Sequence, residues 1–372
     1  MDNSQKTNPR QKPQTYPCPG CGADLVFDPK DNCLVCPYCG RKEPIPESNE
    51  TVVERSYDQY LNPTSEQMGT VAENALEVSC ERCGATVTFA PPEVAGECPF
   101  CGSAIVAQPK SADPMVAPEA VLPFRITQQQ ANESLKNWLS TRWFAPNALK
   151  KFAYHDSIKG VYIPFWTYDA NTSSYYTGER GEYYYVTETY TDRDAQGNTV
   201  TKTRQVRMTR WYSASGEVSR QFDDILISAT KSVSRPRLDS LGPWDLELLN
   251  PYEPAYISGY KAQRYQVGLA EGYEEAKAIM AGVIEDDVRK DIGGDEQRVH
   301  NIDSSYSEIT FKHILLPVYI GAYRFNQKIY QIMINARTGE VQGDRPYSAW
   351  KIAFLILFLL LIAGIILYIK NQ

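Results

Sequence analysis

The chain has 372 residues, of which 42% are hydrophobic and 22% are charged, a composition typical of folded globular proteins rather than disordered ones. Its formal net charge of −7 argues against a protein whose main work is to neutralise nucleic-acid phosphates. All 9 cysteines lie between Cys18 and Cys101. An odd number confined to one end of the chain argues against a chain-wide disulfide framework.

Three segments near the N-terminus have the composition of tails or linkers. Residues 1–15 are polar and proline-bearing, contain no apolar stretch of the kind found in secretory signals, and are expected to be disordered. Residues 46–77 form an acidic segment that is expected to be a mobile linker. Residues 107–123 carry prolines at regular intervals and are expected to be a stiff linker into the next domain.

A duplicated cysteine module occupies residues 16–45 and 78–106. In both copies, two Cys-x-x-Cys pairs are separated by 14 residues, and a short strand-like apolar run lies between them. Both first pairs continue as Cys-Gly-Ala. The spacing predicts two four-cysteine metal sites. Their ligands are Cys18, Cys21, Cys36 and Cys39 in the first copy, and Cys80, Cys83, Cys98 and Cys101 in the second.

The chemistry of these sites favours structural zinc. Two residues between thiolates let one tight turn aim both sulfurs at one ion, and four thiolates complete a tetrahedral shell that leaves no open position for catalysis. A module of this size buries too little apolar surface to fold alone, so the metal supplies the missing stability. Iron in a rubredoxin-like site and redox-active pairs are the alternatives. Cys33 corresponds to Ala95 of the second copy and is interpreted as a spare cysteine.

The charge of the modules bears on what they bind. Residues 16–45 contain three basic and four acidic residues, and residues 78–106 contain one basic and three acidic residues. Four thiolates around a divalent ion add a further formal charge of −2 per site. Neither module therefore has the basic stripe that a phosphate backbone requires, and a structural or protein-binding role is favoured.

Residues 124–345 are predicted to form an α+β, β-rich domain. A capping box at Thr127 and Gln130 predicts a helix start, and an apolar periodicity predicts a second helix from about Gly268 to Ile292. Strands are expected at 161–168, 183–191, 199–211, 315–319 and 330–334. Tyrosines cluster around the second and third of these strands. Cross-strand packing is favoured over an aromatic ligand groove.

No catalytic motif is found in the sequence. It contains no P-loop, no G-x-S-x-G elbow and no HExxH motif, and its three histidines are scattered. Asp223 and Asp224 are adjacent, so on a regular strand they would point to opposite faces, and a turn or strand-edge role is favoured. Asp286 and Asp287 lie on the polar face of a predicted helix. The protein is therefore expected not to be an enzyme.

The C-terminal residues 350–369 predict a transmembrane tail anchor. Residues 352–369 contain no charge and as a helix would span about 27 Å, close to the hydrocarbon thickness of a bilayer. A buried core helix is the alternative, but little chain follows that could cover it. Arg337, Arg345 and Lys351 precede the segment, against Lys370 alone after it. The positive-inside rule therefore predicts a single-pass membrane protein with its N-terminal body in the cytoplasm.

The chain resembles one bacterial family in several features. These are the doubled modules, the run Gly160 to Trp166, the run Phe222 to Asp224, the Thr338-Gly-Glu turn and the tail anchor. The family comprises membrane-anchored double zinc-ribbon proteins described as TFIIB-type zinc ribbon-containing, some of which are labelled primosomal protein N′ or superfamily II helicase. The absence of motor motifs argues against the helicase label. Family members occur beside phage-shock protein A-like and stomatin/flotillin-type proteins, so the resemblance implies a role in envelope stress or membrane organisation.

These observations lead to two main hypotheses about function, and an enzyme with an unrecognised site in residues 120–345 is a third. The first is a non-enzymatic membrane-anchored adaptor whose zinc modules recruit protein partners, such as phage-shock protein A-like or stomatin/flotillin-type proteins, to the inner membrane. The second is a membrane-tethered nucleic-acid-binding protein acting in transcription or replication. The acidic balance of the chain favours the first.

Overall fold

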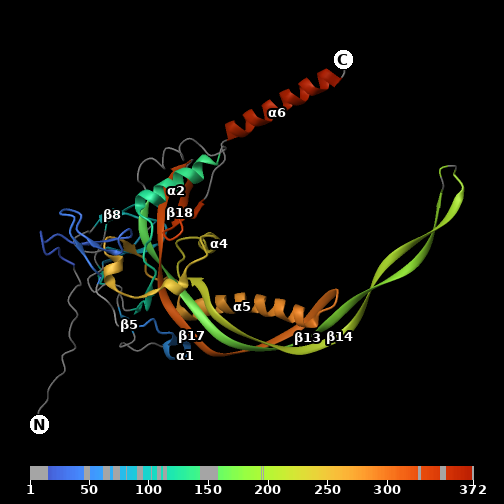
Figure 1. Ribbon diagram of the computed structural model, residues 1–372, viewed down its shortest axis with the longest axis horizontal. Helices are drawn as coiled ribbons and strands as arrows, with labels where there is room; N and C mark the ends of the chain where they lie inside the picture. The colour runs from blue at the N-terminus through green and yellow to red at the C-terminus, as the bar shows by residue number, and fades with distance from the viewer. Residues whose placement is uncertain are drawn as a thin grey trace, which may run out of the picture.

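The computed structural model describes most of the chain. The expected disordered tail, residues 1–15, lies outside the described residues. The described residues are 16–45, 51–61, 68–69, 76–80, 82–89, 95–101, 103–106, 110–111, 115–142, 158–193, 195, 197–325, 328–343 and 349–370. Figure 1 shows a body built on long curved strands, with a separate C-terminal helix.

A nine-stranded sheet forms the centre of the body in the described part of the chain. Its main path runs in the order β14, β13, β17, β12, β15, and β13 is antiparallel to both of its long neighbours. The strands on this path are β12 (Ala120–Val121), β13 (Lys159–Arg193), β14 (Thr199–Ser228), β15 (Asn250–Pro251) and β17 (Glu296–Phe325). Those attached beside it are β4 (Arg55–Ser56), β16 (Lys261–Ala262), β18 (Lys328–Asn335) and β19 (Val341–Gly343).

Burial changes along β13 in three stages, and the sequence explains each. Residues 161–170 are all buried, as expected of an apolar run covered on both faces of the sheet. Residues 171–178 mostly alternate between more and less buried, because one face is covered and the other is open. Beyond Tyr184 the strand is exposed on both faces. There β13 and β14 continue as a two-stranded hairpin that extends past the other elements (Figure 1).

Helix α5 (Leu269–Ile292) lies along the concave side of the long strands (Figure 1). Its buried face repeats every four residues at Ala276, Met280, Ile284 and Val288, and this face packs on the sheet in one hydrophobic cluster. The helix approaches closely at Gly272, where a Cβ would lie 2.5 Å from the Tyr168 hydroxyl oxygen. The predicted helix is thus confirmed.

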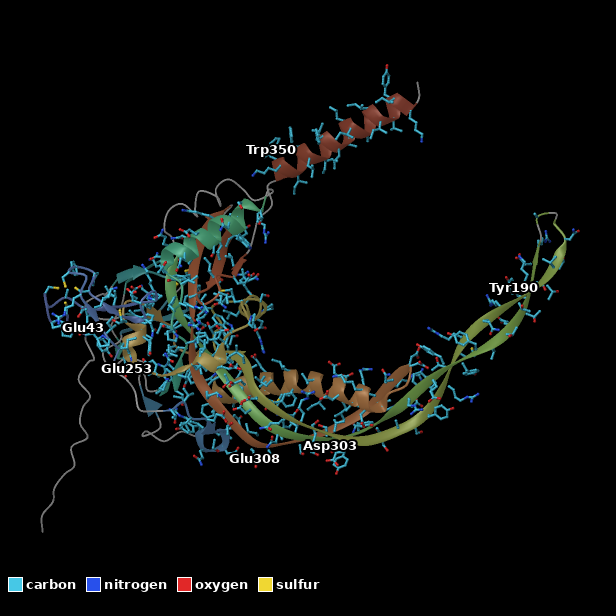
Figure 2. The ribbon with its side chains drawn as sticks, in the orientation of Figure 1. Glu43, Tyr190, Glu253, Asp303, Glu308 and Trp350 are labelled. Carbon is cyan, nitrogen blue, oxygen red and sulfur yellow. The ribbon has the colours of Figure 1, made fainter. Side chains whose placement is uncertain are left out.

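The remaining helices are α2 (Gln128–Ser140), α6 (Ala349–Lys370) and the short α1 (Tyr57–Tyr60), α4 (Arg235–Asp239), η1 (Leu246–Leu248) and η2 (Pro254–Ile257). The predicted capping box of α2 is present: the Gln130 amide donates to the Thr127 hydroxyl, and the Thr127 amide donates to the Gln130 side chain. Helix α6 stands apart from the body, and Trp350 marks its beginning in Figure 2.

The cysteine modules contain small sheets of their own. The first has three strands, in the order β1-β2-β3. The second module and its flanking residues form two sheets, one in the order β10-β6-β7 and one of β8 and β9. β5 and β11 pair in a separate two-stranded sheet. Their bounds are β1 (Val26–Asp28), β2 (Cys33–Val35), β3 (Lys42–Glu43), β5 (Met68–Gly69), β6 (Leu76–Ser79), β7 (Thr86–Phe89), β8 (Ala95–Glu97), β9 (Ala104–Val106), β10 (Lys110–Ser111) and β11 (Met115–Val116).

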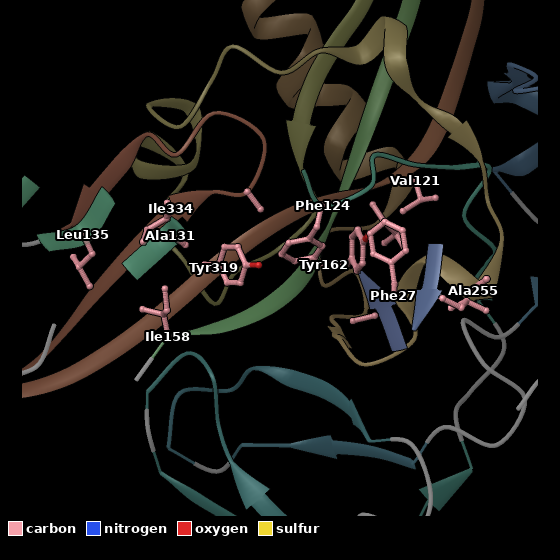
Figure 3. Packing of buried hydrophobic residues seen from close by; sticks show 14 of the residues in the cluster. Phe27, Val121, Phe124, Ala131, Leu135, Ile158, Tyr162, Ala255, Tyr319 and Ile334 are labelled. Carbon is pink, nitrogen blue, oxygen red and sulfur yellow. The ribbon is translucent and has the colours of Figure 1, made fainter. Parts of the chain in front are cut away.

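The modules share their hydrophobic cores with the body. Phe27 of the first module packs with Phe124, Tyr162 and Tyr319 in one cluster, which Figure 3 shows from close by. Phe100 of the second module belongs to a cluster with residues of the central strands. The expected fold class is confirmed: two four-cysteine modules, a β-rich domain with aromatic clusters, and one C-terminal apolar helix.

Two segments expected to be linkers contribute strands to the central sheet. Within 46–77, β4 pairs with β17 next to α1. Within 107–123, β12 lies between β17 and β15, and Leu122 is fully buried. The Arg55 guanidinium pairs with the Glu119 carboxylate and joins the two segments. Each strand is only two residues long and its partner in β17 is more than 190 residues away in sequence, so no local pattern indicates the pairing.

Candidate metal centres

The first four-cysteine site lies in the module formed by residues 16–45. The Sγ atoms of Cys18 and Cys39 are 3.5 Å apart, as are those of Cys21 and Cys36, and Cys21 lies 3.8 Å from Cys39. All four sulfurs lie within 4.8 Å of one another. The sequence spacing therefore brings these four predicted ligands to one point.

The second site repeats this geometry. The Sγ atoms of Cys80 and Cys101 are 3.5 Å apart, those of Cys83 and Cys98 are 3.6 Å apart, and all four lie within 4.8 Å. The sulfurs in both modules belong to free cysteines, and none forms a disulfide. Cys33 is also free and belongs to neither cluster, as expected of a spare cysteine.

The knuckles that hold the sulfurs depend on glycine. Gly22, Gly40 and Gly84 follow a Cys-x-x-Cys pair and have φ of 76°, 72° and 71°, the left-handed region that favours glycine. This conformation turns each glycine amide back onto the carbonyl of the first cysteine of its pair, at 2.8–3.0 Å. The sequence feature Cys-Gly thus has a direct conformational cause.

Backbone and hydroxyl groups act on individual thiols. In the first site, the Cys39 amide donates to the Cys36 Sγ and, against desolvation, lowers the pKa of that thiol to about 6. In the second site, burial opposes ionisation of Cys101, but the Ser103 hydroxyl at 3.2 Å and the Ser103 amide lower its pKa to about 7. The Gly20 amide likewise lowers the pKa of the Cys18 thiol, so each site holds at least one thiol whose surroundings favour the thiolate, the form that binds metal.

The sulfur separations fit a tetrahedral metal ion. Four ligands at about 2.3 Å from a central zinc ion would lie about 3.8 Å from one another. The separations of 3.5–3.8 Å in the two sites are close to this value. Both sites can therefore hold a metal ion without rearrangement, and their four sulfur donors suit a soft or borderline cation.

The first module docks on the body through β1. The Phe27 amide donates to the Ser258 carbonyl at 3.0 Å, and the Ser258 hydroxyl donates to the Leu25 carbonyl at 2.6 Å. The Phe27 ring lies edge-on to Tyr256, with centroids 5.5 Å apart. In the metal site of this module Cys18 and Cys36 are buried with Phe27, whereas Cys21 and Cys39 are exposed.

The second module docks through its metal knuckle. Phe100, between Cys98 and Cys101, is fully buried with Leu238 and Leu241 of the body. The Gln331 side chain donates to the Phe100 carbonyl at 2.6 Å. Three of the four cysteines of this site are buried as a result.

The two modules therefore use equivalent positions differently. Tyr38, between Cys36 and Cys39, corresponds to Phe100, yet Tyr38 is 82% exposed and Phe100 is 0% exposed. One copy of the duplicated knuckle is a packing surface and the other faces solvent.

A cluster of acidic residues, of which only Asp223 and Asp224 stand out in the sequence, lies at a bulge in the pairing of β13 with β14. Carboxylate oxygens of Glu54, Asp169 and Asp223 lie within 4.8 Å of one another. The mostly buried Lys312 binds Glu54 at 3.1 Å and Asp224 at 2.7 Å. Burial raises the pKa of Asp169 to about 6 even though the Asp224 amide donates to it. The cluster is thus an ion network around Lys312, located at a bulge of β14 where Asp224 has φ of 52°. Its residues are far apart in sequence, and the pairing of the strands brings them together.

The C-terminal helix has the properties of a membrane span. Trp350–Lys370 covers 21 residues, its most apolar 18-residue window has a mean hydropathy of 3.2, and none of that window is buried against the body. Among the described residues it is the one helix long and apolar enough to cross a bilayer.

The chain is similar to one curated bacterial protein. "Uncharacterized protein YdjG" of Bacillus subtilis (strain 168) is 26% identical over 356 residues, which cover 91% of this chain and 92% of the relative. The likeness thus extends over nearly the full length of both proteins. No protein-family model and no solved structure matches the chain.

Proposed function

We propose that this protein is a non-enzymatic, zinc-binding adaptor that is anchored in the bacterial inner membrane and recruits protein partners at the cytoplasmic face. Its two four-cysteine sites would each hold one structural zinc ion. Complete thiolate shells leave no position at which a metal-bound water could act, which supports a structural rather than a catalytic role.

The observation that carries this proposal is the exposed knuckle of the first module. A tyrosine held at 82% exposure between two metal ligands combines a large apolar ring with a hydroxyl on a rigid support. Tyrosine is enriched among the residues that dominate protein–protein binding energies. Its counterpart Phe100 already performs this kind of packing inside the molecule, which supports the view that the knuckle is suited to binding protein.

The flanking charges support the proposed topology. Arg337, Arg345 and Lys351 precede the uncharged residues 352–369, and Lys370 alone follows them. An excess of basic residues on the body side supports a cytoplasmic location of the body. In such a location, partners such as phage-shock protein A-like or stomatin/flotillin-type membrane proteins would be within reach, in envelope stress or membrane organisation.

Affinity purification from solubilised membranes tests the adaptor role. We expect the full-length protein to retain specific protein partners and Tyr38→Ala to lose them, with both proteins keeping two zinc ions per chain. Tyr175→Ala is the matched control, because Tyr175 is 63% exposed but lies on β13, outside the cysteine modules and before the outer part of the hairpin. Equal recovery of partners by wild type and Tyr38→Ala would contradict the proposal.

A further inference from the structure

The outer part of the β13–β14 hairpin has two open strand edges. We call residues 182–193 and 199–210 the hairpin arm. β17 pairs with β13 only as far as Gly181, opposite Glu296, and within the described residues no strand continues on that side. β14 is the end strand of the sheet, so its outer edge is also open. Figure 2 shows Tyr190 far out on this arm. Such edges present rows of amide and carbonyl groups that can pair with another strand.

The two strands of the arm carry opposite net charges. Residues 182–193 of β13 contain three acidic residues and one basic residue, Arg193, and residues 199–210 of β14 contain four basic residues and no acidic one. The acidic residues of β13 are Glu182, Glu188 and Asp192, and the basic residues of β14 are Lys202, Arg204, Arg207 and Arg210.

The register inside one chain matches these charges. Arg210 lies opposite Glu182, and Arg204 lies opposite Glu188, which it binds at 2.6 Å. Lys202 and Arg207 lie opposite tyrosines, Tyr190 and Tyr185. Every basic residue on this part of β14 therefore faces a carboxylate or an aromatic ring across the ladder, and both kinds of cross-strand pair are favourable.

We propose that the hairpin arm is an assembly surface for a second copy of this chain. The basic outer edge of β14 in one copy pairs, antiparallel, with the acidic outer edge of β13 in the next copy, in the register already present within each hairpin. Pairing β14 with β14 would instead bring basic residues together, and like charges opposite one another are destabilising.

Because each contact uses two different edges, the association is heterologous rather than a twofold dimer. From Gly181 inward β17 already holds the outer edge of β13, so the contact is confined to the arm and β14 of the second copy leaves the shared sheet after Arg210. The inference goes beyond the adaptor role and does not depend on what the cysteine modules bind.

Cysteine cross-linking between co-expressed full-length copies tests the contact. Thr189 and Thr203 are exposed and lie opposite one another in the register. We expect Thr189→Cys and Thr203→Cys, carried on separate differently tagged chains in one membrane, to form a disulfide-linked dimer after mild oxidation. Neither variant alone should do so, and the unsubstituted chain controls for the native cysteines. No cross-link in the mixture, or equal cross-linking by one variant alone, would overturn the proposal.

Charge exchange tests the cause. Introducing Lys202→Glu and Arg204→Glu on both chains should reduce the cross-link at least tenfold. Adding Glu188→Lys and Asp192→Lys restores the opposite charges within and between copies, so the cross-link should return. The exchanged chain should then link to its own kind and not to the original chain. If Lys202→Glu and Arg204→Glu weaken binding to DNA or to anionic lipid vesicles while the cross-link is unchanged, the basic edge serves that ligand and the proposal is wrong.

Discussion

Tyr38 and Phe100 occupy the same position in two copies of one metal-binding knuckle, and one ring faces solvent while the other is completely buried. The duplication therefore produced two modules with similar sulfur geometry and different surroundings. The second module buries its metal knuckle in the core of the body, whereas Tyr38 and Cys39 in the knuckle of the first module are exposed.

Replacing these two rings should have unequal effects on stability. Phe100→Ala removes a buried aromatic side chain and should lower the free energy of unfolding by about 3–5 kcal/mol. Tyr38→Ala removes an exposed ring and should change it by less than about 0.5 kcal/mol. Urea unfolding of the zinc-loaded proteins in detergent measures both. Equal losses would contradict the assigned packing of the second knuckle.

Chelation should remove the two metal ions in separate phases. Cys21 and Cys39 are exposed in the first site, whereas Cys80, Cys98 and Cys101 are buried in the second. We expect a rapid loss of one zinc ion per chain and a slower loss of the other, followed with a colorimetric zinc indicator. Cys21→Ser should abolish the rapid phase, and Cys83→Ser the slow one. A single phase releasing both ions would contradict this order.

Gly259 should be required for docking of the first module. It has φ of 83°, and a Cβ there would lie 2.8 Å from the Cβ of Val26. Gly259→Ala should therefore combine about 1 kcal/mol of backbone strain with displacement of β1. Faster zinc release from the first site measures the displacement.

Gly197→Ala is the matched control for this substitution. Gly197 has φ of 84°, but no atom of the described residues lies within 4 Å of its added Cβ. Gly197→Ala should lower the free energy of unfolding through backbone strain, but zinc release from the first site should not become faster. Equal release rates in the two variants would argue against the Val26 contact.

His313 should make the body less stable as the pH falls. Its ring is completely buried, Nδ1–H donates to the Val116 carbonyl at 2.8 Å, and within the described residues Nε2 has no hydrogen-bond partner. Burial lowers the pKa of His313 from its ordinary value of 6.5 to about 4. The unfolded chain therefore binds the proton first. The contribution to stability is complete above pH 6.5 and is lost between pH 6.5 and 4, by about 3 kcal/mol.

His313→Gln tests this pH dependence, because its amide can still donate to the Val116 carbonyl but cannot titrate. We expect the difference in unfolding free energy between pH 7 and pH 4.5 to be smaller in this variant than in wild type. His300→Gln is the control, because the His300 side chain is 54% exposed. The same pH dependence in wild type and His313→Gln would show that His313 does not take up this proton.

The sequence allowed those elements to be predicted whose cause is local. The metal sites follow from the Cys-x-x-Cys spacing and the glycines after it, α2 from a capping box within four residues, and α5 from its apolar period. The apolar helix α6 follows from composition alone. The expected strands 183–191 and 199–211 are the outer parts of much longer strands.

The structure alone decided what depends on distant partners. β4 and β12 are two-residue strands whose partners in β17 lie more than 190 residues away. The ion network around Lys312 joins three strands and the segment before β4. No local pattern specifies such contacts, because each is stabilised by burial against residues far along the chain.

The sequence by itself determined that there are two equivalent four-cysteine modules and an apolar C-terminal helix. Only the tertiary structure decided which module faces solvent, because Tyr38 and Phe100 follow the same Cys-Pro dipeptide and differ in what the body places against them. A knuckle turn is built from a few neighbouring residues, whereas its burial depends on surfaces contributed by the rest of the fold.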